Sequence, residues 1–141
     1  MMKVFLDTNV VMDAIVSGRD GKQDALDVIS LGDNLQFRIH ILSLSIANIV
    51  YSARKYVPRE ALMEYIGRIY NDWKILSLGS MDIKFAMKSS CPDFEDALQI
   101  TAAEAESDVI VTNNKKHFTP YTYLPVYTPR EFLNKLKEHQ F

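Results

Sequence analysis

The sequence predicts an α/β fold, a three-layer α/β/α sandwich in which helices cover both faces of a central, mostly parallel sheet. Short apolar runs alternate along the chain with segments of helical periodicity, the pattern of parallel strands joined by crossover helices. Polar residues directly follow several of these runs, as is common at the carboxyl ends of such strands. The chain has 141 residues, enough for a sizeable core, and residues 1–141 are expected to form one domain.

Apolar and β-branched runs predict five strands, and apolar residues spaced three and four apart predict the helices between them. The predicted strands are residues 3–6, 36–42, 73–78, 108–112 and 125–128. The predicted helices are residues 9–17, 22–31, 43–56, 60–70, 81–90, 93–106 and 129–139, with a turn or short helix at 113–118. Gly18 and Gly32 are expected to end the first two helices, and Ser43 to cap the third.

The composition is that of an ordinary globular protein, with 48% hydrophobic and 24% charged residues. No apolar run approaches the roughly 18 residues of a membrane-spanning helix, and residues 1–10 lack a signal-peptide core. A lone Cys91 excludes a disulfide within the chain, so we expect a cytoplasmic protein without membrane association. The net charge of −2 gives no overall footprint of a nucleic-acid-binding protein.

Asp7 is the first candidate site residue, because it ends the first predicted strand. Its carboxylate could cap the following helix, or Thr8 or Asn9 could do so and leave Asp7 free to point into the crevice at the strand ends. These residues stand where a nucleotide-binding fold would carry a Gly-rich loop, which argues against a Rossmann fold or a P-loop.

The stretch CPDFEDALQITAA, residues 91–103, carries three acids and then becomes almost wholly apolar. With Asp93 as N-cap, acids in the first turn gain about 0.3–1 kcal/mol each from the helix dipole, so capping alone accounts for their presence. The apolar character that follows predicts a deeply packed helix. Asp93 and Asp96, three apart, share a face from which Glu95 points away. Two carboxylates here, with a third at a strand end, suit a hard divalent cation.

The predicted helix 43–56 carries a narrow polar stripe of Ser45, Asn48 and Ser52 at spacings of three and four. Small polar groups on a buried helix are commonly satisfied by neighbouring backbone or helices. Alternatively, the stripe faces the same polar crevice as Asp7.

The segment VTNNKKHF follows the fourth predicted strand. Asn113 and Asn114 fit a turn, and their amides could also orient waters or a phosphate. Thr112 could bond locally to the backbone. His117 is expected at the surface rather than as a metal ligand.

Three stretches, in this order, resemble the PIN domain family and particularly its VapC-type and related small single-domain members. They are FLDTNVVMDAI, LSLSIANIVYSARK and DFEDALQITAAEAESDVIVTNNKKHF. The resemblance covers nearly the whole chain and implies an α/β/α sandwich that cleaves RNA with Mg²⁺ or Mn²⁺ held by three or four acids. It also implies a homodimer and an antitoxin partner, and hence the toxin of a toxin–antitoxin pair.

The resemblance places the family's first acid at Asp7 and its third at Asp96, with Asp93 as a frequent neighbour. Asn48 stands where a glutamate is normal, and His117 stands where an aspartate is usual. A site with fewer charges remains feasible for one ion, because Mg²⁺ needs only one or two carboxylates, whereas a two-metal site is less secure.

The expected reaction is metal-assisted phosphodiester hydrolysis, with the cation held by Asp7 and Asp96 and with Asp93 assisting. The residues expected to place waters and phosphate oxygens are Thr8, Asn9, Ser43, Asn48, Thr112 and Asn114. The basic residues expected to flank the crevice as electrostatic guides for RNA are Arg54, Lys55, Lys115 and Lys116.

The neutral residues at positions 48 and 117 favour a rival hypothesis. On this hypothesis the chain is a PIN domain that has lost catalysis and acts as an RNA-binding or protein-interaction module. A third hypothesis, a flavodoxin-like or receiver-like α/β domain, would use an acidic pocket near Asp7 but leaves the pattern of residues 93–118 unexplained.

Overall fold

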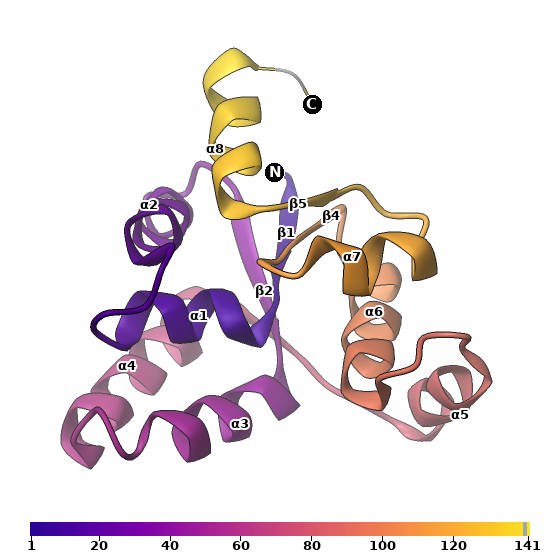
Figure 1. The fold of residues 1–141 in the computed structure, drawn as a ribbon, viewed down its shortest axis with the longest axis horizontal. Coiled ribbons are helices and arrows are strands. Elements are labelled where there is room, and N and C mark those ends of the chain that lie inside the picture. The colour runs from indigo at the N-terminus through magenta and orange to yellow at the C-terminus, as the bar shows by residue number, and fades with distance from the viewer. Residues whose placement is uncertain (140) are drawn as a thin grey trace.

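The apolar runs form a five-stranded sheet in the order β3-β2-β1-β4-β5, and every pairing in it is parallel. The computed structural model describes residues 1–139 and 141 (Figure 1). The strands are β1 (Lys3–Leu6), β2 (Arg38–Leu42), β3 (Lys74–Leu76), β4 (Val109–Val111) and β5 (Val126–Tyr127). The chain therefore begins at the centre of the sheet and adds two strands on each side.

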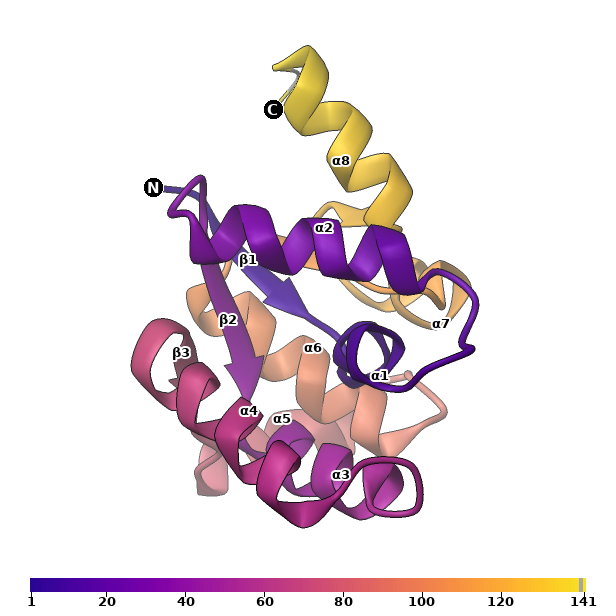
Figure 2. The ribbon, with the colours of Figure 1, turned by 90° about the vertical axis from the view of Figure 1, so that its left-hand side faces the viewer.

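Helices cover both faces of the sheet, so the predicted α/β/α sandwich is confirmed. One face packs against α1 (Thr8–Ile15), α2 (Lys22–Asp33), α3 (Ser43–Ala53), α4 (Arg59–Asp72) and α8 (Pro129–Glu138). The other packs against α5 (Ser80–Lys88), α6 (Phe94–Glu106) and α7 (Lys115–Phe118), which leads into a 3₁₀ turn at Thr119–Tyr121. In Figure 1 these two groups lie on opposite sides of the strands, and Figure 2 shows α2 crossing in front of β1 and β2.

The strands read as continuous apolar runs because successive side chains enter different cores. In β1, Val4 and Leu6 point into one core and Phe5 into the other, and all three are fully buried. A strand that is covered on both faces has no solvent side, so its sequence shows no polar alternation.

Two of the expected helix boundaries are wrong. Gly32 is the penultimate residue of α2 and does not end it; a glycine stands here because a Cβ would overlap the side chain of Ile39 on β2. Ser43 is the first residue of α3, while the N-cap position belongs to Leu42, so the Ser43 side chain makes no capping bond. The remaining differences are shifts of a few residues at element ends.

The carboxyl ends of the central strands meet at one edge of the sheet, and this edge positions the site. Asp7 follows β1 and Thr112 follows β4, and the backbone N–H of Asp7 donates to the carbonyl of Val111 at 3.0 Å. The chain therefore holds its first acid against the end of the neighbouring strand. None of the helices in the described part of the chain has the length and apolar character needed to cross a membrane.

Candidate functional site

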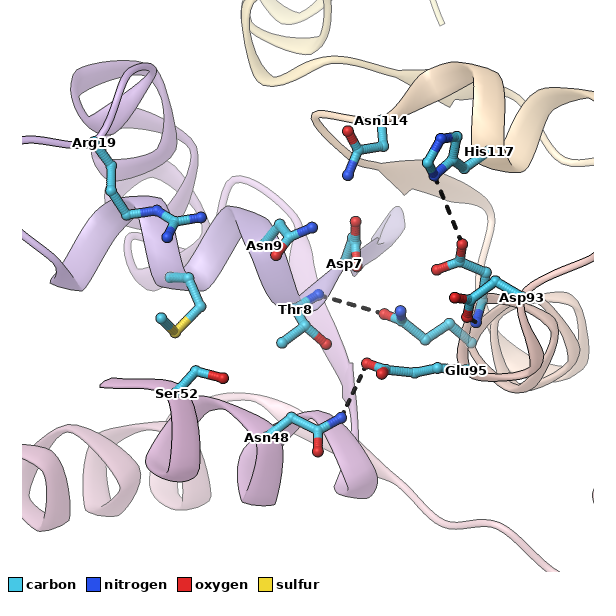
Figure 3. A pocket seen from close by; sticks show the side chains of 13 residues that line it. Asp7, Thr8, Asn9, Arg19, Asn48, Ser52, Asp93, Glu95, Asn114 and His117 are labelled. Atoms are coloured by element: carbon cyan, nitrogen blue, oxygen red, sulfur yellow. Dashed lines mark hydrogen bonds and ion pairs between the residues drawn. The ribbon is translucent and has the colours of Figure 1, made fainter. Parts of the chain in front are cut away.

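A polar cavity of about 470 Å³ opens at this edge of the sheet (Figure 3). Its walls come from α1 and the loop after it, from α3, from the first turns of α6 and from the segment after β4. The lining residues are Asp7, Thr8, Asn9, Met12, Arg19, Asn48, Ser52, Asp93, Glu95, Asp96, Gln99, Asn114 and His117. Four of them are carboxylic acids, contributed by segments far apart in the sequence.

Asp7 occupies the N-cap position of α1, yet its side chain does not cap the helix. Instead, one carboxylate oxygen, Oδ2, accepts a hydrogen bond from the hydroxyl of Thr112 at 2.8 Å. The Asp7 side chain is therefore free of the capping role without Thr8 or Asn9 taking that role over. The residue is only 3% exposed. Burial raises the pKa of Asp7 above the ordinary value for aspartate, and hydrogen bonding by Thr112 and Gln99 opposes this rise in part.

Asp93 caps α6 as expected, since its Oδ1 accepts the backbone N–H of Asp96 at 2.9 Å. Asp96 itself is half-buried in the cavity. Burial, and next the charges of Asp93 and Asp7, raise the pKa of Asp96 to about 6. The metal-free cavity therefore contains carboxylates that repel one another.

Glu95 was expected to point away from the other acids, and the structure contradicts this expectation. Its Oε1 accepts a hydrogen bond from Nδ2 of Asn48, at 2.9 Å across the cavity (Figure 3). Side chains in an α-helix lean toward its N-terminus, so first-turn residues on different faces project beyond the helix end together. A rule based on faces of one helix fails there, because the partner of Glu95 belongs to α3.

The polar stripe of α3 faces the same cavity as Asp7. Asn48 and Ser52 line the cavity, and the buried hydroxyl of Ser45 accepts a hydrogen bond from Thr8 Oγ1 at 2.7 Å. The helix is less buried than its sequence predicts, because only Ser45, Ile49 and Ala53 are fully covered.

Thr112 was expected to contact the substrate, and the structure contradicts this expectation. The residue is fully buried and cannot reach a substrate. Its hydroxyl donates to Asp7 and accepts the backbone N–H of Asn114 at 3.0 Å, which ties the end of β4 to the acid. The side chain of Asn114 reaches the cavity, whereas Asn113 turns away and donates to the carboxylate of Asp13. Thr112 is therefore a residue that positions Asp7.

His117 lies at the surface, as expected, but it also lines the cavity. Its side chain is 52% exposed, and its Nδ1 lies 3.9 Å from Oδ2 of Asp96. The short helix α7 turns the imidazole back toward the first turn of α6 (Figure 3). An imidazole therefore stands beside the acid in the place where the resemblance expects a carboxylate.

The expected basic guides are not the cations of this cavity. Arg54 stacks on the ring of Tyr51 at 3.7 Å, and Lys115 pairs with Glu131 at 3.1 Å. Lys116 lines an adjacent cavity beside Asp96. Lys55 and Ser43 are exposed and do not contribute to the lining.

Arg19 is the cation that lines the cavity, and sequence reasoning missed it. Its Nε donates to Oδ1 of the buried Asp13 at 2.7 Å, and the guanidinium faces the space near Asn9 (Figure 3). The only local signal was its position after Gly18, whose positive φ of 83° turns the chain back. Gln99, also missed, accepts the backbone N–H of Thr8 at 3.4 Å, and its polarity within an apolar helix was the available signal.

The oxygen-rich donor set of this cavity fits Mg²⁺ or Mn²⁺ better than a softer metal. Within residues 1–139 and 141, no three side chains of the His, Cys, Asp and Glu types converge closely enough to ligate one ion. The fit therefore rests on the pair Asp7 and Asp96, whose pKa values are raised mainly by burial and further by neighbouring carboxylate charges, which a cation would offset. Two carboxylates are sufficient for Mg²⁺, which retains several waters.

Replacing Asp96 with asparagine is expected to stabilise the metal-free protein at pH 7.5. The raised pKa means that wild-type stability falls as pH rises from about 4 to about 6, and this penalty persists above that range. Asp96→Asn removes the penalty and should gain about 1–2 kcal/mol, less than the full shift implies because solvent screens part of it. Urea unfolding in a chelator at pH 7.5 and pH 4 measures the difference.

At pH 4 the gain should be much smaller, because the carboxyl group is then protonated in the folded protein and about half protonated in the unfolded chain. Glu106→Gln, at the exposed end of the same helix, is the matched control. It should leave the free energy of unfolding nearly unchanged at both pH 7.5 and pH 4. An Asp96→Asn variant less stable than wild type at pH 7.5 would contradict this electrostatic description.

Solved structures with the same fold include chains of toxin–antitoxin complexes. The DNA-bound VapBC of Salmonella typhimurium is 17% identical over 92% of this chain and 99% of its own, with a TM-score of 0.68. VapBC2 of Rickettsia felis, bound to a promoter DNA fragment, is 21% identical over 89% of this chain and 97% of its own, with a TM-score of 0.66. A chain of a toxin–antitoxin complex from Klebsiella pneumoniae is 18% identical over 89% of this chain and 97% of its own, with a TM-score of 0.65. At these identities the likeness concerns the fold alone.

No curated protein matches this chain in sequence. A family model of the PIN domain does match it over residues 3–116, a range that contains β1 to β4 and every residue lining the cavity except His117. The match agrees with the parallel five-stranded sheet and with the acids at its carboxyl edge. The chain is a member of the PIN domain family.

Proposed function

We propose that this protein is a metal-dependent ribonuclease that hydrolyses RNA phosphodiester bonds with Mg²⁺ or Mn²⁺. The observation that carries the proposal is the shared cavity of Asp7 and Asp96, in which both carboxyl groups have raised pKa values. Perturbed acids in one cleft are typical of functional sites. Asp7 and Asp96 would hold the cation, and Asp93 would assist with the carboxylate that also caps α6.

A bound divalent cation supplies Lewis-acid polarisation of a phosphate and lowers the pKa of water. The residues of the chain prepare the site for it. Thr112 occupies one oxygen of Asp7 and fixes the orientation of that carboxylate. The buried amide of Gln99 lies beside Asp7 and holds the start of α1 in place. A preorganised acid of this kind needs little rearrangement when the cation binds.

Binding of the RNA backbone is assigned to groups on the rim of the acidic cavity. Asp13 engages Nε of Arg19, so the terminal guanidinium nitrogens remain to donate to phosphate oxygens. The amides of Asn9 and Asn114 line the same cavity and can orient phosphate oxygens or waters. The imidazole of His117 lies 3.9 Å from the carboxylate of Asp96 on the same rim, so RNA would meet a ring nitrogen there and not a further acid.

Cleavage of a structured RNA in Mg²⁺ or Mn²⁺ tests this proposal directly. Wild type should cleave, and Asp7→Asn and Asp96→Asn should each lose activity by about 100-fold or more, because each variant removes a carboxylate proposed to hold the cation. Chelation should abolish cleavage. Arg19→Ala should raise the KM for RNA more than it lowers kcat, as expected for a phosphate contact outside the reacting centre.

Glu106→Gln is the matched control for these variants and should cleave like wild type, since Glu106 is exposed and outside the cavity. Equal cleavage by wild type and Asp96→Asn would refute the nuclease assignment. Absence of cleavage together with tight RNA binding would favour the alternative, a catalytically degenerate PIN domain that acts as an RNA-binding or protein-interaction module. Asn48 and His117, neutral or basic where acids are usual, are the observations that favour this alternative.

The toxin role, with a homodimer and an antitoxin partner in the cytoplasm, is a further part of the proposal. It is supported by the fold that this chain shares with chains of toxin–antitoxin complexes. Large apolar side chains on the outer surfaces of α3, α4 and α5, including Tyr51, Tyr70 and Phe85, are available for protein contacts.

Expression of the protein alone in a bacterial host should arrest growth, and the product of a small adjacent open reading frame should relieve the arrest. Arrest by wild type but not by Asp7→Asn would tie toxicity to the acidic cavity. Equal arrest by both would separate toxicity from this site and count against the toxin role as proposed.

A further inference from the structure

The bond between Glu95 and Asn48 joins helices that cover opposite faces of the sheet. Asn48 belongs to α3, whose apolar side packs in the core with α1 and α2, whereas Glu95 belongs to α6 in the other core. The two side chains meet only where the sheet ends, inside the acidic cavity. A contact at this place brings a fourth carboxylate to the site.

We propose that Glu95 replaces the acid that the family resemblance places at position 48, and that Asn48 is the neutral partner that holds it there. The cation site of the proposed function is the basis of this inference. No three acids converge as ligands in the described part of the chain, so Glu95 would act on water bound to the cation rather than ligate the ion itself. It is a positioning residue for that water.

The chemistry of the pair supports this exchange of roles. Asn48 donates through Nδ2 to Oε1 of Glu95, which leaves Oε2 to accept from water. A carboxylate at position 48 would instead lie within hydrogen-bonding distance of a like charge, which is unfavourable. An amide on α3 is therefore a residue type that can hold an acid on α6 in this position without adding a like charge beside it.

The charge of Glu95 also reaches the two proposed ligands. It contributes to raising the pKa values of both Asp7 and Asp96, although burial is the largest cause for each. If the hydrogen bond between Asn48 and Glu95 served only to join α3 to α6, it would contribute little to the stability of the fold. Glu95 is exposed, and water competes for its hydrogen bonds. The like charges make its position unfavourable without a cation, and a bound cation would offset that repulsion.

Manganese binding by the metal-free protein, without RNA, tests the proposal. Glu95→Gln keeps an oxygen that can accept from Asn48 but removes the charge, and should weaken Mn²⁺ binding about 10-fold or more by calorimetry. The double variant Asn48→Glu with Glu95→Gln moves the carboxylate across the cavity while keeping a donor and an acceptor. It should recover most of the lost affinity. Glu106→Gln should bind Mn²⁺ like wild type.

A second readout separates this role from a purely structural one. The metal-free Tm of Glu95→Gln should equal or exceed that of wild type, because the variant removes repulsion. A lower Tm with unchanged Mn²⁺ affinity would reduce Glu95 to a tether and overturn the proposal. Failure of the double variant to regain affinity, or no Mn²⁺ binding by wild type, would also overturn it. If the affinities change as stated but no RNA is cleaved, the ribonuclease proposal fails and the role of Glu95 stands.

Discussion

Repulsion among carboxylates at the carboxyl edge of the sheet is the constraint on which the site depends. Asp7, Asp93, Glu95 and Asp96 share one cavity, and both Asp7 and Asp96 have raised pKa values there. Such an arrangement is unfavourable without a counter-ion, so the rest of the fold must hold it in place. Two apolar cores, one on each face of a fully parallel sheet, supply that rigidity.

Three of the four acids are each held by a different neighbour, and these neighbours lie in three different places of the fold. Thr112, after β4, orients Asp7, whereas the first-turn backbone of α6 engages Asp93 and Asn48 of α3 engages Glu95. Arg19, the cation that lines the cavity, is itself restrained by the buried carboxylate of Asp13. Under the proposed function, this preorganisation would suit a divalent cation and a phosphate, with acids that need not come from the usual positions.

The sequence was sufficient for the fold and for part of the site. Continuous apolar strands alternating with helices predicted the layers, and the strand-end rule indicated Asp7. The position of Glu95 depends on which helix lies opposite the first turn of α6, and that of Arg19 on a loop turned by a positive-φ glycine. Both are set by tertiary packing, which local periodicity does not encode. Gly32 was misjudged for the same reason, since its need for smallness comes from Ile39 on β2.

The central claim, that the acids of this cavity hold a divalent cation, is tested most directly by locating the ion. Crystals of the wild-type protein soaked in Mn²⁺ would show it through anomalous scattering at the manganese edge. The account predicts one strong peak in the cavity, in contact with carboxylate oxygens of Asp7 and Asp96. A peak bound elsewhere, or a cavity without one at saturating Mn²⁺, would contradict it.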